Sequence, residues 1–201
     1  MGYLKGQYMC QDCGCSITDH HHHEHEHTHS HDSSTHQAAH ETLHHNPQLN
    51  DVTVGNGIVY ISGSGSDTIY KIEGDEIDEV AKDTLGRLNG LLYQKEGIYY
   101  AASASHCFGL YNMDSQTFKT LVPDIGHGDG VIRLDNEDFI ISSWQGQIFY
   151  IDSDNWTKTL LLDTRDESIN AADIDYIPAT RTLLVPTFFD NRVVAYKVNY
   201  E

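Results

Sequence analysis

The stretch GHGDGVIRLDNEDFIISSWQGQIFYI, residues 126–151, determines the fold class of this chain. It contains three runs rich in β-branched and aromatic residues, and Gly, Asn, Asp or Ser residues separate them. Runs of this length between turn residues are typical of short antiparallel strands. A fourth run, TKTLLL at residues 157–162, follows a further polar turn. The stretch therefore predicts four short strands in succession.

The same order of runs recurs along residues 51–201. The second run of each unit is GIVYIS, GIYYAAS, DFIISSW or TLLVPTF, and the equivalent residues Ile58, Ile98, Phe139 and Leu183 are 40, 41 and 44 residues apart. Four short strands in each unit of this length are the pattern of a β-propeller blade. An irregular β-sandwich is the alternative, but it does not predict a repeated order of runs. We therefore predict an all-β fold, a partial β-propeller of about four blades.

The first run of each unit begins with an amide or a carboxylate. The set is Asn50 (or Asp51), Asn89, Asp129 and Asp173. The innermost strands of a propeller line its central channel, so equivalent positions on them converge on the axis. Carboxylate and amide oxygens suit a hard divalent cation such as calcium, magnesium or manganese. The alternative is that these Asn-Gly and Asp-Gly pairs are only turn residues.

Residues of about 49–201 resemble the C-terminal blades of the senescence-marker/gluconolactonase-like family of six-bladed propellers. The resemblance rests on LNDVTV, LNGLL, GHGDGVIRLDNEDFIISSWQGQIFYI and NAADIDYIPATRTLLVPTFFDNRVVAYKV. It implies one divalent cation on the axis and, in some members, hydrolysis of lactones or esters. By this resemblance Asn89 and Asp129 match metal ligands, and Asn50 matches a position near metal and substrate. The acidic ligand from the family's first blade has no counterpart in this sequence.

Two residues are candidates for catalysis, Asp129 and His127. His127 precedes Asp129 by two positions, and we expect it at the mouth of the channel, where it can contact substrate or solvent. The large aromatic residues are interpreted as packing residues rather than binding residues: Trp144, Trp156, Phe188 and Phe189.

Four units do not complete a six-bladed ring, so two blade faces lack neighbours. Exposed faces of this kind favour self-association. The last unit also lacks a closing run, because only NYE follows NRVVAYKV. In a closed ring a strand from the N-terminal end completes such a unit, and here that end is polar and His-rich. We therefore expect an open, self-associating arc of blades.

Residues 9–32, MCQDCGCSITDHHHHEHEHTHSHD, contain a dense set of metal-binding side chains. Cys10, Cys13 and Cys15 form a C-x-x-C-x-C pattern, whose two-residue gap lets two sulfurs reach one ion. The histidines are His20, His21, His22, His23, His25, His27, His29 and His31. Thiolates with imidazoles favour nickel, zinc or copper over magnesium or calcium. A purification tag is disfavoured because acids interrupt the histidines, and a redox dithiol because no strand–helix pattern surrounds the cysteines.

This stretch, with HETLHHNPQLND at residues 40–51, resembles the N-terminal region of the hydrogenase nickel-incorporation accessory GTPases. The resemblance implies that the three cysteines form a tight nickel site and that the histidines store nickel and zinc. A GTPase needs a phosphate loop of the form G-x-x-x-x-G-K-[ST]. The Gly-rich stretch SGSGSDT at residues 62–68 has no Lys. We therefore predict metal binding without GTPase activity.

Composition excludes some partners. The net charge is -18, with 12 basic and 30 acidic residues, and such a surface repels nucleic acid. No apolar run is long enough for a transmembrane helix, and MGYLKGQY lacks the apolar core of a signal peptide. The sequence therefore favours a cytoplasmic protein with no nucleic-acid or membrane partner.

We divide the chain into an extension (1–8), a Cys/His-rich arm (9–48) and a propeller domain (49–201). The arm has almost no aliphatic residues and is expected to be largely disordered. We interpret the chain as a fusion of these parts, joined near residues 49–51. Its predicted function is nickel or zinc sequestration, with metal binding favoured over catalysis. The alternatives are a divalent-metal-dependent lactonase or esterase that uses the propeller axis, and a non-catalytic interaction scaffold.

Overall fold

The computed structural model describes residues 3–9, 47–82, 84 and 86–200, whose regular structure is β apart from two 3-10 turns. The strands form four antiparallel sheets of four strands each, which we name blades 1 to 4 in chain order. No helix in the described ranges is long and apolar enough to cross a membrane. Cys10, Cys13, Cys15 and the histidines of the predicted arm lie outside the described residues.

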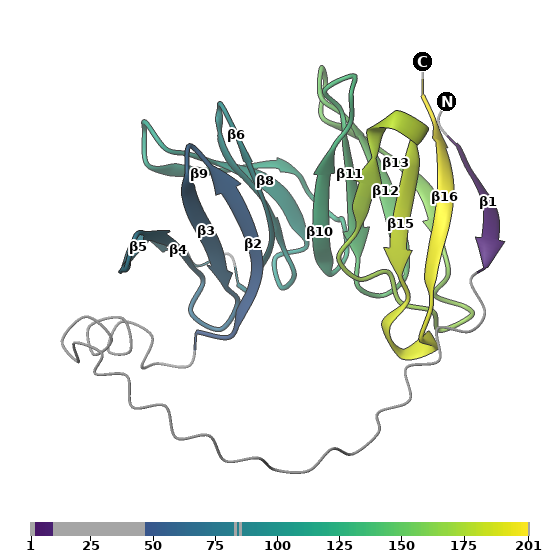
Figure 1. Cartoon of the computed structure of the whole chain (residues 1–201), viewed down its shortest axis with the longest axis horizontal. Helices are drawn as coiled ribbons and strands as arrows, with labels where there is room; N and C mark the ends of the chain where they lie inside the picture. The colour runs from purple at the N-terminus through teal and green to yellow at the C-terminus, as the bar shows by residue number, and fades with distance from the viewer. Residues whose placement is uncertain (1–2, 10–46, 83, 85, 201) are drawn as a thin grey trace, which may run out of the picture.

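The first three blades are each built from four consecutive strands. Blade 1 contains β2 (Leu49–Gly55), β3 (Ile58–Gly63), β4 (Thr68–Glu73) and β5 (Glu76–Lys82). Blade 2 contains β6 (Leu88–Gln94), β7 (Gly97–Ala102), β8 (Cys107–Asn112) and β9 (Thr117–Val122). Blade 3 contains β10 (Gly128–Arg133), β11 (Phe139–Ser143), β12 (Gln147–Asp152) and β13 (Thr157–Asp163). The predicted propeller fold is confirmed, since the blades follow one another in chain order (Figure 1).

Blade 4 joins the two ends of the chain. It contains β14 (Asp175–Ile177), β15 (Thr182–Pro186), β16 (Val193–Asn199) and β1 (Tyr3–Met9), with 3-10 turns at Pro178–Thr180 and Phe188–Asp190. Strand β1 pairs antiparallel with β16, so that Tyr3 lies opposite Asn199 (Figure 1). The expectation that the last unit lacks a fourth strand is therefore wrong. The seven residues of β1 are too few and too mixed in polarity to indicate a strand before their partner is known.

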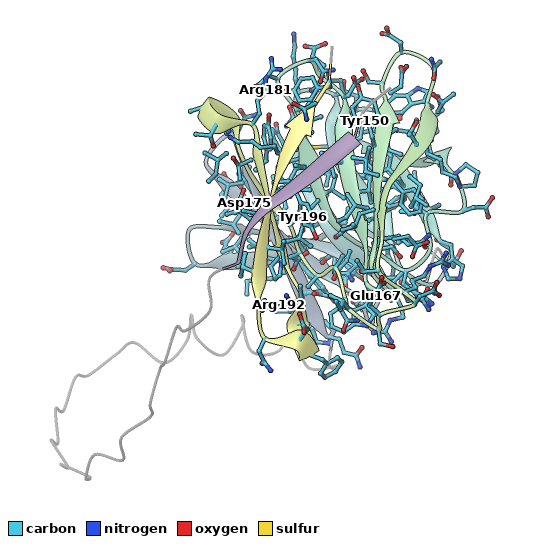
Figure 2. The ribbon with its side chains drawn as sticks, turned by 90° about the vertical axis from the view of Figure 1, so that its right-hand side faces the viewer. Tyr150, Glu167, Asp175, Arg181, Arg192 and Tyr196 are labelled. Atoms are coloured by element: carbon cyan, nitrogen blue, oxygen red, sulfur yellow. The ribbon has the colours of Figure 1, made fainter. Side chains whose placement is uncertain are left out.

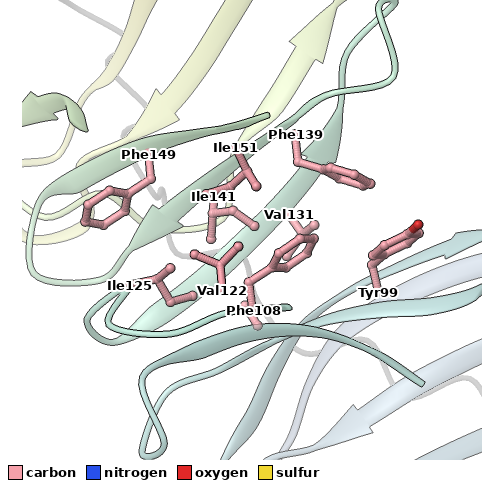
Figure 3. Packing of buried hydrophobic residues seen from close by; sticks show 10 residues of the cluster. Tyr99, Phe108, Val122, Ile125, Val131, Phe139, Ile141, Phe149 and Ile151 are labelled. Atoms are coloured by element: carbon pink, nitrogen blue, oxygen red, sulfur yellow. The ribbon is translucent and has the colours of Figure 1, made fainter. Parts of the chain in front are cut away.

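The hydrophobic core is divided among the junctions between successive blades. One cluster lies between blades 1 and 2 and includes Tyr60, Ile69, Leu91 and Tyr100. A second lies between blades 2 and 3 and includes Phe108, Phe139 and Ile141, which face one another in Figure 3. A third lies between blades 3 and 4 and includes Ile140, Leu183 and Val185. Each junction therefore holds its blades together by side-chain packing, because backbone pairing ends at the edge of each sheet.

Candidate functional site

A β-bulge in the innermost strand of each of the first three blades positions the polar residues predicted for the axis. The register of β2 with β3 shifts between Leu49 and Val52, and β6 and β10 show matching shifts. A bulge redirects side chains from the regular alternation of a strand. The residues inside the bulges are Asn50 with Asp51, Asn89 with Gly90, and Asp129 with Gly130. These amides and carboxylates are therefore strand residues and not turn residues.

The glycine in two of these bulges lets the next blade approach closely. A Cβ atom at Gly90 would lie 1.9 Å from the carbonyl oxygen of Asp129. A Cβ atom at Gly130 would lie 2.6 Å from the backbone nitrogen of Ile174. A side chain at either position would force the innermost strands apart, so the glycines set the width of the axial site.

Blade 1 has Asp51 where the next two blades have glycine. The carboxylate of Asp51 accepts a hydrogen bond from the backbone N–H of Val52 at 2.7 Å and another from that of Leu91 at 2.6 Å. The second bond crosses from blade 1 to blade 2. Asp51 therefore joins two blades, and its oxygens are partly engaged before any ligand arrives.

The four residues predicted for the axis line a single cavity of about 630 Å³. All four blades contribute to its wall, which is formed by Asn50, Arg87, Asn89, Ser103, Ala104, His127, Asp129, Trp144, Ala172, Asp173, Pro186 and Phe188. The volume lies within the usual range of small-molecule sites. The topology thus brings together polar groups that are up to 123 positions apart in the chain.

Asp129 is the most shielded carboxylate of the cavity, with 5% of its surface exposed. Burial raises the pKa of its carboxyl to about 7, and the negative charges of Asp173 and Asp51 act in the same direction. A hydrogen bond from the side chain of Asn89 opposes these effects. Asp129 therefore changes its charge near neutral pH, which is typical of cation sites and of acid–base groups.

The pKa values of the two neighbouring carboxylates, Asp51 and Asp173, are also raised. Burial raises the pKa of Asp51 to about 6, against the lowering effect of the hydrogen bond from Leu91, and the charge of Asp173 raises it further. Asp173 faces the open cavity, but the surrounding walls displace part of its water and raise its pKa as well. The three carboxylates repel one another, so the cavity is an electrostatically strained site that a cation would relieve.

The donor set fits a hard cation in chemistry but not as a closed cage. Within the described residues, no three His, Cys, Asp or Glu side chains lie close enough together to hold a metal ion. Amide oxygens supply what this set lacks, and hard cations accept them readily. The Oδ1 atom of Asn89 is buried and finds no hydrogen-bond partner in the part of the chain described here. An orphaned acceptor of this kind, beside Asp129, suits a cation held by amide, carboxylate and water oxygens.

His127 lies in the cavity wall, and Ser103 and Arg87 accompany it. The Nδ1 atom of His127 is 3.3 Å from the Oγ atom of Ser103, and its ring meets the ring of His106 edge-on with centroids 4.8 Å apart. Arg87 adds the positive charge of the cavity wall. Ser103 and Arg87 were not singled out from the sequence: Ser103 is the last residue of the run GIYYAAS, Arg87 directly precedes β6, and the repeat pattern marks neither as a site residue.

The aromatic residues divide into two groups. Trp156 packs against the core between blades 2 and 3, as predicted. Trp144, Phe188 and Phe189 instead contact one another edge-on near the cavity, and Phe188 and Phe189 are 56% and 73% exposed. Phe188 has a φ of +49°, an unfavourable conformation for a bulky residue. The packing prediction is thus incomplete, since Trp144 and Phe188 also form an apolar wall of the cavity.

The comparison with known proteins supports the fold. No family model matches the chain, and no curated protein sequence matches it. Among solved structures, the chain is similar to virginiamycin B lyase from Staphylococcus aureus, with a TM-score of 0.61 and 13% identity. It is also similar to a protein described as a gluconolactonase (TM-score 0.60, 12% identity) and to a luciferin-regenerating enzyme (TM-score 0.55, 15% identity).

These matches cover 74%, 75% and 76% of this chain, but only 51%, 58% and 61% of those chains. The chain therefore spans between half and two thirds of the length of the propellers that it matches. At these identities the similarity establishes the propeller fold alone. The activity has to be argued from the cavity itself.

Proposed function

We propose that the axial cavity binds a divalent cation together with a small carbonyl compound, and that it hydrolyses cyclic or simple esters. The single observation that carries this proposal is the convergence of Asn89, Asp129 and Asp173 in one cavity in which Asp129 is shielded from water. Buried carboxylates with raised pKa values and an unpaired amide oxygen are costly unless a ligand compensates them. A calcium, magnesium or manganese ion is such a ligand.

The residues of the cavity divide the remaining tasks. Asn89, Asp129 and Asp173 would hold the cation, which would polarise the ester carbonyl, and Asn50 lies beside them. His127 can accept a proton from water, with Ser103 orienting its ring. Arg87 offers a positive charge for an anionic group, and Trp144 with Phe188 offers an apolar surface for a ring. The class of substrate that fits best is therefore a small lactone or ester with one apolar face.

Calorimetric titration of chelator-treated protein with calcium, magnesium or manganese tests whether the axial cavity binds a divalent cation. We expect Asp129→Asn to abolish binding of all three ions. The control Asp114→Asn, in the exposed turn between β8 and β9, should leave binding unchanged. Binding that survives in Asp129→Asn would contradict the proposal.

Hydrolysis of a panel of lactones and aryl esters, followed with a pH indicator, tests the reaction. We expect His127→Gln to reduce kcat by about two orders of magnitude or more, since general base catalysis contributes this much. It should leave cation affinity unchanged. Cation binding with no hydrolysis of any member of the panel would reject the enzymatic part and leave a binding protein.

We propose as a second function that the Cys/His-rich arm binds nickel or zinc. The specific observation is the C-x-x-C-x-C pattern of Cys10, Cys13 and Cys15 beside eight histidines. Soft and borderline ions prefer these ligands, whereas calcium and magnesium do not, so the two sites are separable by choice of ion.

Titration of the full chain with nickel or zinc tests the arm. Substitution of Cys10, Cys13 and Cys15 by Ser should remove the tightest site and leave weaker histidine binding. The control Cys107→Ser changes a buried cysteine of the propeller and should have no effect on nickel affinity. An unaltered tight site in the triple variant would contradict the role of the three cysteines.

A further inference from the structure

Blade 1 presents an apolar face that no other blade covers. Residues directly opposite each other in adjacent strands share a face of the sheet. One such row crosses all four strands and consists of Val54, Val59, Ile72 and Ile77. The neighbouring row contains Val52, Ile61 and Tyr70, of which Tyr70 is buried beside Ser66. Val52 and Val54 are 57% and 63% exposed, so this face is apolar and open to water at the innermost strand.

The corresponding face of blade 2 is covered. Its equivalent row consists of Tyr93, Ile98, Tyr111 and Phe118. These four side chains belong to the cluster that packs against Tyr60 and Ile69 of blade 1. The open face of blade 1 is therefore composed like a face that, one blade later, is buried by a neighbouring blade.

Blade 4 has the complementary open face. Tyr176, Leu183 and Val185 point into the cluster shared with blade 3. Neighbouring residues of a strand lie on opposite faces of the sheet, so the residues next to these three lie on the face that points away from blade 3. That face includes Ile177, Leu184, Pro186, Val193 and Ala195. Ile177 is 42% exposed and Val193 is 53% exposed. Figure 2 shows this blade at the front of the molecule, with Asp175 and Tyr196 labelled.

We propose that the open face of blade 1 packs on the open face of blade 4 from a second copy of this chain, so that two copies close one eight-bladed ring. When two different faces of a protein pack on each other, copies can add without limit and form a filament. If successive copies are related by a twofold axis, the assembly closes after two copies. Eight blades lie within the range that propellers adopt. Within the described residues, the buried clusters join blades 1 to 2, 2 to 3 and 3 to 4, and none joins blade 4 to blade 1.

The area available supports a closed dimer over a single contact. Four strands spaced 4.8 Å apart, with about six residues of 3.3 Å each, cover about 400 Å² on one face. One junction joins two faces and buries about 800 Å², which is the size of a weak or crystal-packing contact. A closed pair of chains has two junctions and buries about 1,600 Å², which is the size of a standard stable interface.

The mass of the full chain in solution tests the proposal. Sedimentation or light scattering should give twice the chain mass of 22.6 kDa. The buffer should contain a chelator and a reductant, so that metal or disulfides do not link chains through the Cys/His-rich arm. Because each copy has a net charge of -18, we expect the dimer to tighten as salt is raised. A monomer at all concentrations and salt levels would overturn the proposal, as would oligomers that grow without limit.

Two variants and a matched control locate the junction. Val54→Lys charges the open face of blade 1, and Ile177→Lys charges that of blade 4; both side chains are exposed, so the fold should persist. Each variant alone should convert the dimer to monomer. Leu160→Lys, at an exposed apolar residue of β13 in blade 3, should leave the dimer intact. If Val54→Lys dissociates the dimer and Ile177→Lys does not, blade 1 pairs with itself and the ring proposal is wrong.

Discussion

Among the described residues of one copy, blades 2 and 3 lie between neighbours, whereas blades 1 and 4 each have a neighbouring blade on one side only. All six residues of β7 and all five of β11 are buried, because both faces of their sheets are covered. The equivalent strands are less buried: β15 alternates between half-buried and buried residues, and β3 is half-buried at Ile58, Val59 and Ile61. The same repeated sequence unit thus has two different environments. Position in the ring, more than the sequence of a blade, decides how much each side chain contributes to stability.

The largest expected difference in stability is between alanine variants of two isoleucines at equivalent positions of blades 3 and 1. Ile141 pairs with Val131 in blade 3 and is fully buried, whereas Ile61 pairs with Val52 in blade 1 and is half-buried. Ile141→Ala should lower the free energy of unfolding by about 4 kcal/mol, because it leaves a cavity between two blades. Ile61→Ala should cost about 1 kcal/mol in the monomer. Urea denaturation of both variants at low protein concentration measures the difference, and equal losses would show that the outer face of blade 1 is covered after all.

The second prediction compares how Asp129 and Asp173 affect the pH dependence of the free energy of unfolding. Because burial raises the pKa of Asp129 to about 7, the folded protein retains a proton that the unfolded chain releases near pH 4. The free energy of unfolding should therefore fall as pH rises from about 4 to about 7, and level off above that. At pH 8, without divalent cations, Asp129→Asn should stabilise the protein by about 3 kcal/mol. Asp173→Asn should stabilise it less, because Asp173 is exposed to the cavity.

Thermal denaturation between pH 4 and pH 8 in a chelator tests this pair. Asp129→Asn should flatten most of the pH dependence, and the part that remains belongs to Asp51, whose pKa is about 6, and to Asp173, whose pKa is also raised. An Asp129→Asn variant that is less stable than the original chain at pH 8 would show that the carboxylate is stabilised in the folded protein.

Replacing a glycine at the junction between two blades should cost more stability than replacing a glycine in an outer turn. Gly90→Ala places a methyl group against the carbonyl oxygen of Asp129, so the innermost strands of blades 2 and 3 must move apart. We expect a loss of about 2 kcal/mol. Gly74 lies in the turn between β4 and β5 with a φ of +65° and open space around it, so Gly74→Ala should cost only about 1 kcal/mol. Guanidinium denaturation of both variants ranks them, and the reverse order would mean that the axial strands adapt easily.

The smallest expected effect compares two basic residues. Arg133 lies at the rim of the junction between blades 2 and 3, where its Nη1 donates to Gln94 at 3.0 Å and its guanidinium lies 5.6 Å from the ring centroid of Phe139. Arg133→Met should cost about 1 kcal/mol. Lys71 of blade 1 makes exposed ion pairs with Asp78 and Glu73, and Lys71→Met should change stability less than Arg133→Met does. Differential scanning calorimetry of the two variants is sufficient to compare them.

The sequence predicted most of the fold, because the propeller repeat combines short apolar runs, turn residues and a near-constant spacing. The strand order within the first three blades and the positions of Asn50, Asn89, Asp129 and Asp173 followed from that spacing. The bulges that hold three of these residues did not follow from it, because a bulge depends on pairing between strands. The pairing of β1 with β16 was not predicted either, since it links residues 3–9 to residues 194–199.

The cavity wall was harder to predict than the axial residues. Arg87 and Ser103 adjoin the inner strands of blade 2, whereas Trp144 and Phe188 belong to blades 3 and 4, and only the assembled ring brings all four to one wall. Arg87 and Phe188 both have positive φ values, which a sequence pattern does not reveal for residues other than glycine. The nickel or zinc site predicted for the arm stays a prediction, since its residues lie outside the described ranges.

The pairing of β1 with β16 also sets the order in which the molecule can be built. Tyr3 leaves the ribosome long before its partner Asn199 is synthesised, so blades 1 to 3 can form while the fourth sheet still lacks an edge strand. Closing a loop of this length costs entropy that only the finished sheet repays, so we expect this pairing to form late in folding. Until then β16 exposes an unpaired edge, and a newly made chain in a crowded cell is most vulnerable to mispairing at that strand.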